Sequence, residues 1–254
     1  MMQNLIDRLG EFNPQLFREI KGRIIRRNIF LTIAGSIIFQ FLILIVRNGQ
    51  LPRPYEEMAE YSYPIYSGYC LGGNEQAYSR SNVCDVLQND WHINWQLFHL
   101  DSFVTLAIAS YFILLVAGTY LLIADLAKEE RRHTLDFLRL TPQSAWSIMT
   151  GKLLGVPSLV YLFIALTIPY QLFSAIGASI NPLMLMGYGL LVAASAMFFF
   201  TAGMFLALIV PSSVGFKPWL GSGTVLFFLW VSTAMIHNNY GDLSPIPPWI
   251  GYFI

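Results

Sequence analysis

The sequence predicts an all-α polytopic membrane protein, and three observations lead to that prediction. Hydrophobic residues make up 55% of the 254 residues and charged residues only 12%, a balance typical of membrane proteins. The apolar residues gather in long uncharged runs of about the length that crosses a bilayer. Lysines and arginines concentrate in alternate connections between these runs. We therefore expect one membrane domain over residues 1–254 with about five transmembrane helices.

An amphipathic helix is predicted at residues 13–28. Asn13 is a suitable cap, and Pro14 suits the first helical position. Apolar residues fall on one side of this helix, and cations crowd the remainder: Arg18, Lys21, Arg23, Arg26 and Arg27. We expect it to lie in the membrane interface with its cations near anionic headgroups, and an ordinary solvated helix is the alternative.

The first two spans are predicted at residues 29–46 and 102–124. Residues 29–46 are eighteen uncharged residues, at the lower end of the length that crosses hydrocarbon. Acidic residues precede this run and no small-residue cleavage site follows it, so we expect it to be retained rather than removed as a signal peptide. Residues 102–124 are uncharged and are bracketed by Asp101 and Asp125.

A hydrophilic loop, residues 47–101, holds both cysteines of the chain. Thirteen residues separate Cys70 from Cys84. If the loop faces an oxidising compartment, a disulfide is expected, and it would stabilise the loop by about 3 kcal/mol in the chain-entropy model. Two free thiols are the alternative. A metal site that uses His92 or His99 is disfavoured, because neither a CxxC nor an HxxxH spacing occurs.

A polar segment, residues 125–152, follows the second span. Its many ionised side chains require water, so the segment has to lie at one face of the bilayer. A helix is expected to end near Leu140, and a second short helix is expected to start with Thr141 as cap and Pro142 at its first position. Trp146 and Met149 alternate with polar residues, as in a helix that lies along a surface.

Three further spans are predicted at residues 153–178, 182–210 and 219–236. Pro157 and Pro169 are expected to bend the first of them. Small residues in the second are expected to allow close helix contact: Gly189, Ala193, Ala196, Gly203 and Ala207. Residues 237–254 form a tail on the outer side, polar at first and then apolar.

The distribution of cations predicts the orientation. Six lysines and arginines precede the first span, five lie in residues 125–152 and one is Lys217, against three in residues 47–101. With a cytoplasmic N-terminus, twelve of the fifteen lie inside, as the positive-inside rule requires. We expect a multi-pass protein of the cell's inner (plasma) membrane, with the cysteine loop outside and the polar segment inside.

Two stretches resemble ABC-2 type transporter permeases. Residues 130–142 (ERRHTLDFLRLTP), followed by Trp146-Ser147-Ile148 and by GKLLG at 151–155, are similar to the cytoplasmic segment between the second and third spans of that family. Residues 13–23 (NPQLFREIKGR) resemble the opening of such permeases. The order of the predicted spans extends the resemblance over most of the chain.

The resemblance implies a short coupling helix that docks on a separate ATP-binding cassette ATPase subunit. The residues implied at that interface are Glu129, Glu130, Arg131, Thr134, Leu138, Thr141, Pro142 and Trp146. Two permease chains, identical or different, would pair with two ATPases, and ATP-Mg would bind to the partner. Residues 13–28 would be an elbow helix on the cytoplasmic leaflet. The family usually continues with a re-entrant hairpin and a sixth span, which these 254 residues leave unaccounted for.

The chain itself is not expected to bind ATP or to act as an enzyme. Gly151-Lys152 is followed by Leu153, and Trp146 stands where a phosphate-binding loop requires glycine. The predicted spans contain no Asp, Glu, Lys or Arg for a proton relay. No cofactor, metal or nucleic acid is expected. Uncharged side chains would line the pathway and favour an amphipathic or lipid-linked cargo: Gln40, Thr105, Ser110 and Tyr120.

Two other functions remain open. An enzyme at the outer face would draw on acidic and histidine residues before the second span, namely Asp85, Asp90, His92, His99 and Asp101, although no nucleophile-base spacing is recognisable among them. A membrane scaffold or assembly subunit would use residues 125–152 to bind a partner other than an ATPase.

Overall fold

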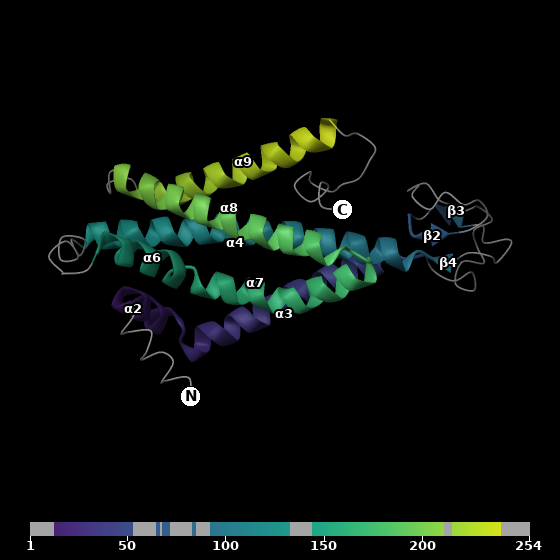
Figure 1. Cartoon of the computed structure of the whole chain (residues 1–254), viewed down its shortest axis with the longest axis horizontal. Coiled ribbons are helices and arrows are strands. Elements are labelled where there is room, and N and C mark those ends of the chain that lie inside the picture. Colours follow the sequence, from purple (N-terminus) through teal and green to yellow (C-terminus); the bar gives the residue numbers. More distant parts are fainter. Residues whose placement is uncertain are drawn as a thin grey trace. The chain divides into compact units, whose positions relative to one another are not determined.

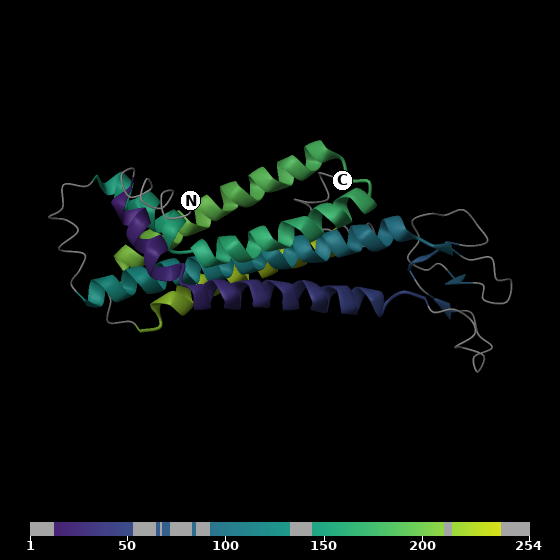
Figure 2. The same cartoon turned by 90° about the horizontal axis from the view of Figure 1, so that it is seen from below.

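The computed structural model of the chain describes residues 13–52, 65–66, 68–71, 83–84, 92–132, 144–210 and 215–239. The regular secondary structure of these residues is helical apart from four strands of two residues each, in agreement with the predicted fold class (Figures 1 and 2). The seven helices are α2 (Pro14–Arg23), α3 (Arg26–Asn48), α4 (Trp95–Arg131), α6 (Ala145–Gly155), α7 (Ser158–Gly177), α8 (Pro182–Ile209) and α9 (Lys217–Asn239).

Four of the described helices are long and apolar enough to cross a membrane, which indicates a multi-pass membrane protein. They are α3, α4, α7 and α8, and they contain the first and second predicted spans and most of the third and fourth. Large apolar side chains on them are exposed, for example Phe41 on α3, Ile176 on α7 and Leu190 on α8, as lipid-facing residues would be. The predicted fifth span lies within α9, which is not among the four, so that span stays a prediction.

The described residues belong to two compact units. The first unit draws on Met1–Ser36, Ile108–Leu166 and Pro182–Ile254, and the second on Ile37–Ala107 and Thr167–Asn181. Helices α3, α4 and α7 each contribute residues to both units.

The core of the first unit lies along the second half of α4. Leu115, Leu122 and Ile123 of this helix are fully buried among apolar residues of α6, the start of α7, α8 and α9. Phe200 of α8 is also fully buried, and its ring fills the space beside Gly118, where any Cβ would overlap it. These contacts hold α8 close to α4.

Three of the small residues that were predicted to allow close helix contact lie on the buried face of α8. Ala196, Gly203 and Ala207 are buried, and Gly203 lies so close to α4 that an added Cβ would come within 2.8 Å of the Thr119 methyl group. Gly189 and Ala193, by contrast, are exposed. The predicted close contact therefore applies only to part of the α8 sequence.

In the second unit the loop after α3 forms short antiparallel pairs. Strand β1 (Ile65–Tyr66) pairs with β3 (Val83–Cys84), and β2 (Cys70–Leu71) pairs with β4 (His92–Ile93). Strand β2 also contacts β3, which brings the two cysteine-bearing strands together. Cys70 is fully buried and is not a free thiol, but the side chain of Cys84 lies outside the described part. The Cys70–Cys84 disulfide thus stays a prediction.

One polar cluster in this unit joins the loop to the helix ends. The Tyr69 hydroxyl donates a hydrogen bond to Asp101 Oδ2 at 2.8 Å, and Arg47 Nη1 donates to the same hydroxyl at 3.3 Å. Burial, and then the nearby Asp101 carboxylate, raises the pKa of Tyr69 to about 12, so the hydroxyl keeps its proton at physiological pH.

Several helix boundaries differ from those expected. The predicted helix at 13–28 is broken: α2 ends at Arg23, Ile24 leaves the helical conformation, and α3 starts at Arg26. Helix α4 continues past the predicted end of its span into the polar segment, as far as Arg131. The predicted third span is divided, because its first residues belong to α6 and α7 begins only at Ser158, after Pro157.

The short helix in the polar segment also starts later than predicted. Ser144 has an extended backbone, and its hydroxyl accepts a hydrogen bond from the Ser147 N–H, so α6 begins at Ala145. A continuous helix from Pro142 would require helical geometry at Ser144. Helix α6 therefore begins three residues after the predicted start at Pro142, and Thr141 and Pro142 themselves lie outside the described residues.

Candidate functional site

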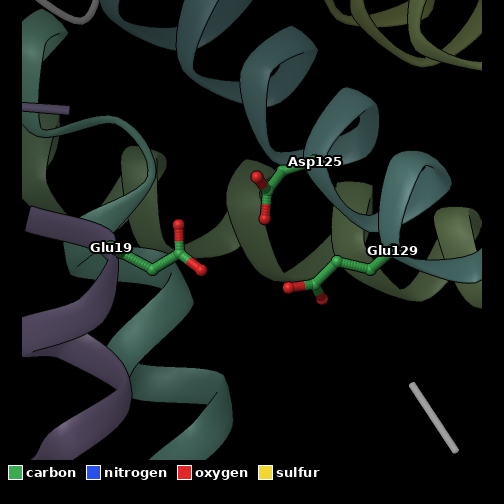
Figure 3. A group of neighbouring side chains, drawn as sticks. All are labelled: Glu19, Asp125 and Glu129. Carbon is green, nitrogen blue, oxygen red and sulfur yellow. The ribbon is translucent and has the colours of Figure 1, made fainter. Parts of the chain in front are cut away.

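An ion cluster joins three helices of the first unit. Its acidic members come from α2 and α4, and Figure 3 shows the three carboxylates converging on one space. Its basic members come from α2 and α6. The ion cluster consists of Glu19, Asp125, Glu129, Arg18, Arg23 and Lys152.

Lys152 lies at the centre of the ion cluster. Its ammonium is 2.8 Å from Asp125 Oδ2, 2.7 Å from Glu129 Oε2 and 3.6 Å from Glu19 Oε1. The side chain is only 3% exposed. One cation of α6 therefore binds carboxylates of both α2 and α4.

The two arginines of the ion cluster tie α2 directly to α4. Arg23 Nη2 lies 2.5 Å from Asp125 Oδ1, and Arg18 Nη2 lies 2.8 Å from Glu129 Oε1. Within α2, Arg23 also approaches Glu19 one turn away, at 3.5 Å. Three carboxylates thus face three cations, and the ion cluster has no formal net charge.

The environment keeps Lys152 charged. Burial alone would lower the pKa of Lys152, but the Asp125 and Glu129 carboxylates outweigh burial and raise the pKa above its ordinary value. Burial of an ammonium with this many carboxylate partners costs far less free energy than burial of an isolated one. Removal of one partner would leave an uncompensated buried charge.

The three carboxylates of the ion cluster are also a possible set of metal ligands. Oxygen atoms of Glu19, Asp125 and Glu129 lie within 4.8 Å of one another, and three carboxylates are suitable ligands for a hard cation. However, the Lys152 ammonium already lies within 3.6 Å of an oxygen of each, and two arginines neutralise the remaining charge. The residues therefore fit an internal ion cluster better than a metal site.

A further ion pair ties α9 to the same end of α4. Lys217, the first residue of α9, is fully buried, and its ammonium lies 2.9 Å from Glu130 Oε2. Neighbouring carboxylates at the end of α4 thus bind cations from α2, α6 and α9.

Close backbone packing supports the ion cluster on the side of α2. Helix α2 lies against α6, with Leu16 buried between them (Figure 1). A Cβ added at Gly151 would come within 2.9 Å of the Leu16 backbone nitrogen, and one at Gly155 within 2.5 Å of Glu19 Cβ. The four-residue spacing of these glycines lets the two helices approach, as in membrane helix pairs.

The cap of α2 reaches across to α6 as well. Asn13 Oδ1 accepts hydrogen bonds from the N–H groups of Gln15 and Leu16, as predicted for the cap. The Asn13 amide then donates to the Ser147 carbonyl of α6 at 2.9 Å. One side chain therefore starts α2 and fixes it to the beginning of α6.

The predicted interface residues separate into inward and outward groups. Glu129 and Glu130 point to internal cations, whereas Arg131 is exposed and Trp146 is 70% exposed on α6. The other four predicted interface residues, Thr134, Leu138, Thr141 and Pro142, lie outside the described residues.

The five cations predicted to lie at the membrane interface also separate into two that bind carboxylates of the chain and three that are exposed. Arg18 and Arg23 bind carboxylates of α4. Lys21 is exposed and lies 5.3 Å from the centre of the Phe17 ring, and Arg26 and Arg27 are exposed at the start of α3.

Sequence reasoning did not select Glu19, Asp125 and Lys152 as site residues. One signal was present, because Asp125 and Glu129 are four residues apart and so share a helix face. A second was the Gly151-x-x-x-Gly155 spacing, which predicts close helix packing. Neither signal identifies the partner helix.

Two of the residues considered for an outer-face enzyme, His99 and Asp101, already have partners within the chain. His99 stacks edge-on against Phe173 and fills the space beside Gly177, and Asp101 accepts the Tyr69 hydrogen bond. His92 is exposed in strand β4, while Asp85 and Asp90 lie outside the described residues.

The residues expected to line a pathway also have contacts within the chain. Arg47 donates a hydrogen bond to the Thr105 hydroxyl, and the Tyr120 ring packs edge-on against Trp219. Ser110 is buried and Gln40 is half-buried.

Neither a family model, a curated protein nor a solved structure matches this chain. Its own structure therefore defines its class as a multi-pass helical membrane protein whose ion cluster joins α2, α4 and α6. Any more particular function is a proposal.

Proposed function

We propose that the chain is the membrane-spanning permease subunit of an ATP-driven ABC-2 type transporter, an exporter of amphipathic or lipid-linked cargo. A separate ATPase subunit binds at α6 and supplies the energy. The proposal rests on the resemblance of residues 13–23 and 130–155 to that family and on the predicted cytoplasmic placement of both segments.

The contacts of Lys152 support the proposed transmission of movement from α6. A force applied to α6 acts on α2 and α4 together, because its lysine binds carboxylates on both helices. Helix α4 is a single helix of 37 residues that continues from the ion cluster into a candidate membrane span. Movement of α6 at the ATPase is then transmitted along α4 into the membrane.

The ATPase contact uses exposed groups rather than the whole interface set implied by the resemblance. Trp146 on α6 and Arg131 at the end of α4 are exposed and available to a partner. Glu129 and Glu130 support the contact indirectly, because their carboxylates hold α6 and α9 in place. Exposed tryptophan and arginine are the residues most often decisive at protein interfaces.

Co-purification from native membranes tests the proposal. A subunit with a Walker phosphate-binding motif should be recovered with the chain, and Trp146→Ala should reduce its recovery at least tenfold, as expected for a lost interface anchor. Trp230→Ala is the matched control, since Trp230 is also exposed but lies on α9, and recovery should not change.

Two results would contradict the proposal. Recovery of a partner without ATPase activity would support a scaffold or assembly subunit instead. ATP-dependent movement of a fluorescent lipid analogue in vesicles that is unaffected by Trp146→Ala would remove α6 from the energy-transfer route.

A further inference from the structure

Two arginines at the break between α2 and α3 make no side-chain contact with a charged or polar partner in the described residues. Arg26 and Arg27 begin α3, and both are exposed. Among the described residues, no hydrogen bond or ion pair joins either side chain to a partner. Arg18 and Arg23 of the same segment, by contrast, bind α4 carboxylates. The segment therefore has two exposed arginines without a partner in the described part of the chain.

Exposed apolar side chains flank this arginine pair. Ile24 and Ile25 precede it and are 38% and 53% exposed, and Phe30 follows it at 71% exposed. Large apolar groups that are contiguous with exposed cations favour a partner that is apolar beside a negative charge. A phospholipid with an anionic headgroup has both features in one molecule.

The position of the pair along α3 agrees with such a partner. Arg26 is the first residue of a helix that is long and apolar enough to cross a membrane, and almost none of that helix is buried inside the chain. Arginines at the end of such a helix lie at the headgroup level, because their stems stay in the apolar layer while the guanidinium groups reach the phosphates.

We infer that the α2–α3 break is a binding surface for anionic phospholipids. Arg26 and Arg27 bind the headgroup, and Ile24, Ile25 and Phe30 contact the upper acyl chains. An acidic protein would satisfy the arginines, but it would leave the apolar side chains that continue along α3, such as Leu31 and Phe41, without a cover. The surface does not depend on an ATPase partner.

Native mass spectrometry of the full chain tests this inference. The protein is freed of lipid in detergent and titrated with equal amounts of phosphatidylglycerol and phosphatidylcholine. Wild type should retain phosphatidylglycerol preferentially. Arg26→Gln/Arg27→Gln should lower the phosphatidylglycerol affinity by about 30-fold, the effect expected for two cations near a membrane surface. Arg26→Lys/Arg27→Lys should retain most of it, because the charge remains.

The matched control removes two exposed arginines elsewhere. Arg131→Gln/Arg132→Gln takes the same charge from the end of α4, where the preceding Leu126 and Ala127 are buried, and should change the affinity less than threefold. Equal losses in both double variants would mean that only net charge matters and would overturn the inference. So would equal retention of the two lipids by wild type. Unchanged melting temperatures should accompany both variants, since all four side chains are exposed.

Discussion

At the scale of single residues, Lys152 places a buried ammonium between carboxylates of two other helices. Replacement by methionine keeps most of the side-chain volume but removes the charge, leaving three carboxylates opposite two arginines. We expect Lys152→Met to lower the free energy of unfolding by about 3–5 kcal/mol, as for other broken buried ion pairs. Denaturant unfolding in detergent micelles would measure the change.

Lys128→Met is the matched control for that variant. Lys128 lies on α4 within one turn of Asp125 and Glu129, but it is exposed and has no described ion pair. Exposed substitutions of this kind change stability by less than about 0.5 kcal/mol. Equal effects of the two variants would show that the contacts of Lys152 do not stabilise the fold.

The raised pKa of Lys152 predicts how this stabilisation depends on pH. A lysine whose pKa is raised on folding stabilises the native state fully below its unfolded pKa, about 10.4, and the stabilisation disappears as the pH rises through the higher folded value. The stability difference between wild type and Lys152→Met should therefore be constant from pH 7 to pH 9 and shrink above about pH 10.4. Unfolding curves at pH 8 and pH 11 provide the comparison, and a difference that shrinks below pH 9 would contradict the assignment.

At the scale of helices, the approach of α2 to α6 depends on glycines. A methyl group at Gly155 would come within 2.5 Å of the Cβ of Glu19, which is a member of the ion cluster. We expect Gly155→Ala to destabilise the fold by about 1–3 kcal/mol through overpacking. Loss of protection in hydrogen exchange should be concentrated in α2.

Gly189→Ala is the control for Gly155→Ala, because it adds the same methyl group where no other helix is close. Gly189 lies within α8, and an added Cβ would meet nothing within 4 Å. Alanine favours a helix over glycine by about 1 kcal/mol, so this variant should be neutral or more stable. A loss of stability at Gly189 as large as that at Gly155 would contradict the assignment of the Gly155 effect to the contact between α2 and α6.

Helix starts were predictable where their signals are local. Asn13 and Pro14 cap and begin α2 as expected, because both the cap and the first turn are formed by neighbouring residues. The same signals at Thr141-Pro142, which lie outside the described residues, did not predict the start of α6, because Ser144 caps that helix. Two good caps in one short stretch cannot be ranked from local preferences alone.

The sequence predicted where the charged residues of the ion cluster lie along the chain, but not how they pair. Its charges stand in segments predicted to lie in water, but Arg23 and Asp125 are 102 residues apart in sequence. Their pairing is determined by how α2 packs on α6 and α4, which no local pattern encodes. For the same reason Glu130 was expected at a partner interface, although its carboxylate binds the buried Lys217 of α9.

At the scale of the whole molecule, the orientation in the membrane decides which surfaces can meet which partners. The charge distribution predicts that residues 47–101 lie outside and residues 125–152 inside. Both cysteines fall in the outer loop, on strands β2 and β3, which contact each other. The two cysteines therefore report the orientation and the predicted disulfide in one experiment.

Intact cells treated with a membrane-impermeant maleimide should show no labelling of wild type, because a disulfide blocks both thiols. Labelling should appear after an impermeant reductant is added, since the loop is accessible from outside. Arg132→Cys in a background with Cys70→Ser and Cys84→Ser should be labelled only after permeabilisation, because Arg132 is exposed at the predicted inner face.

Labelling of wild type without reductant would disprove the disulfide while keeping the orientation. Labelling of Arg132→Cys in intact cells would instead place α6 outside, out of reach of any ATP-hydrolysing partner, and the proposed function would fail with it.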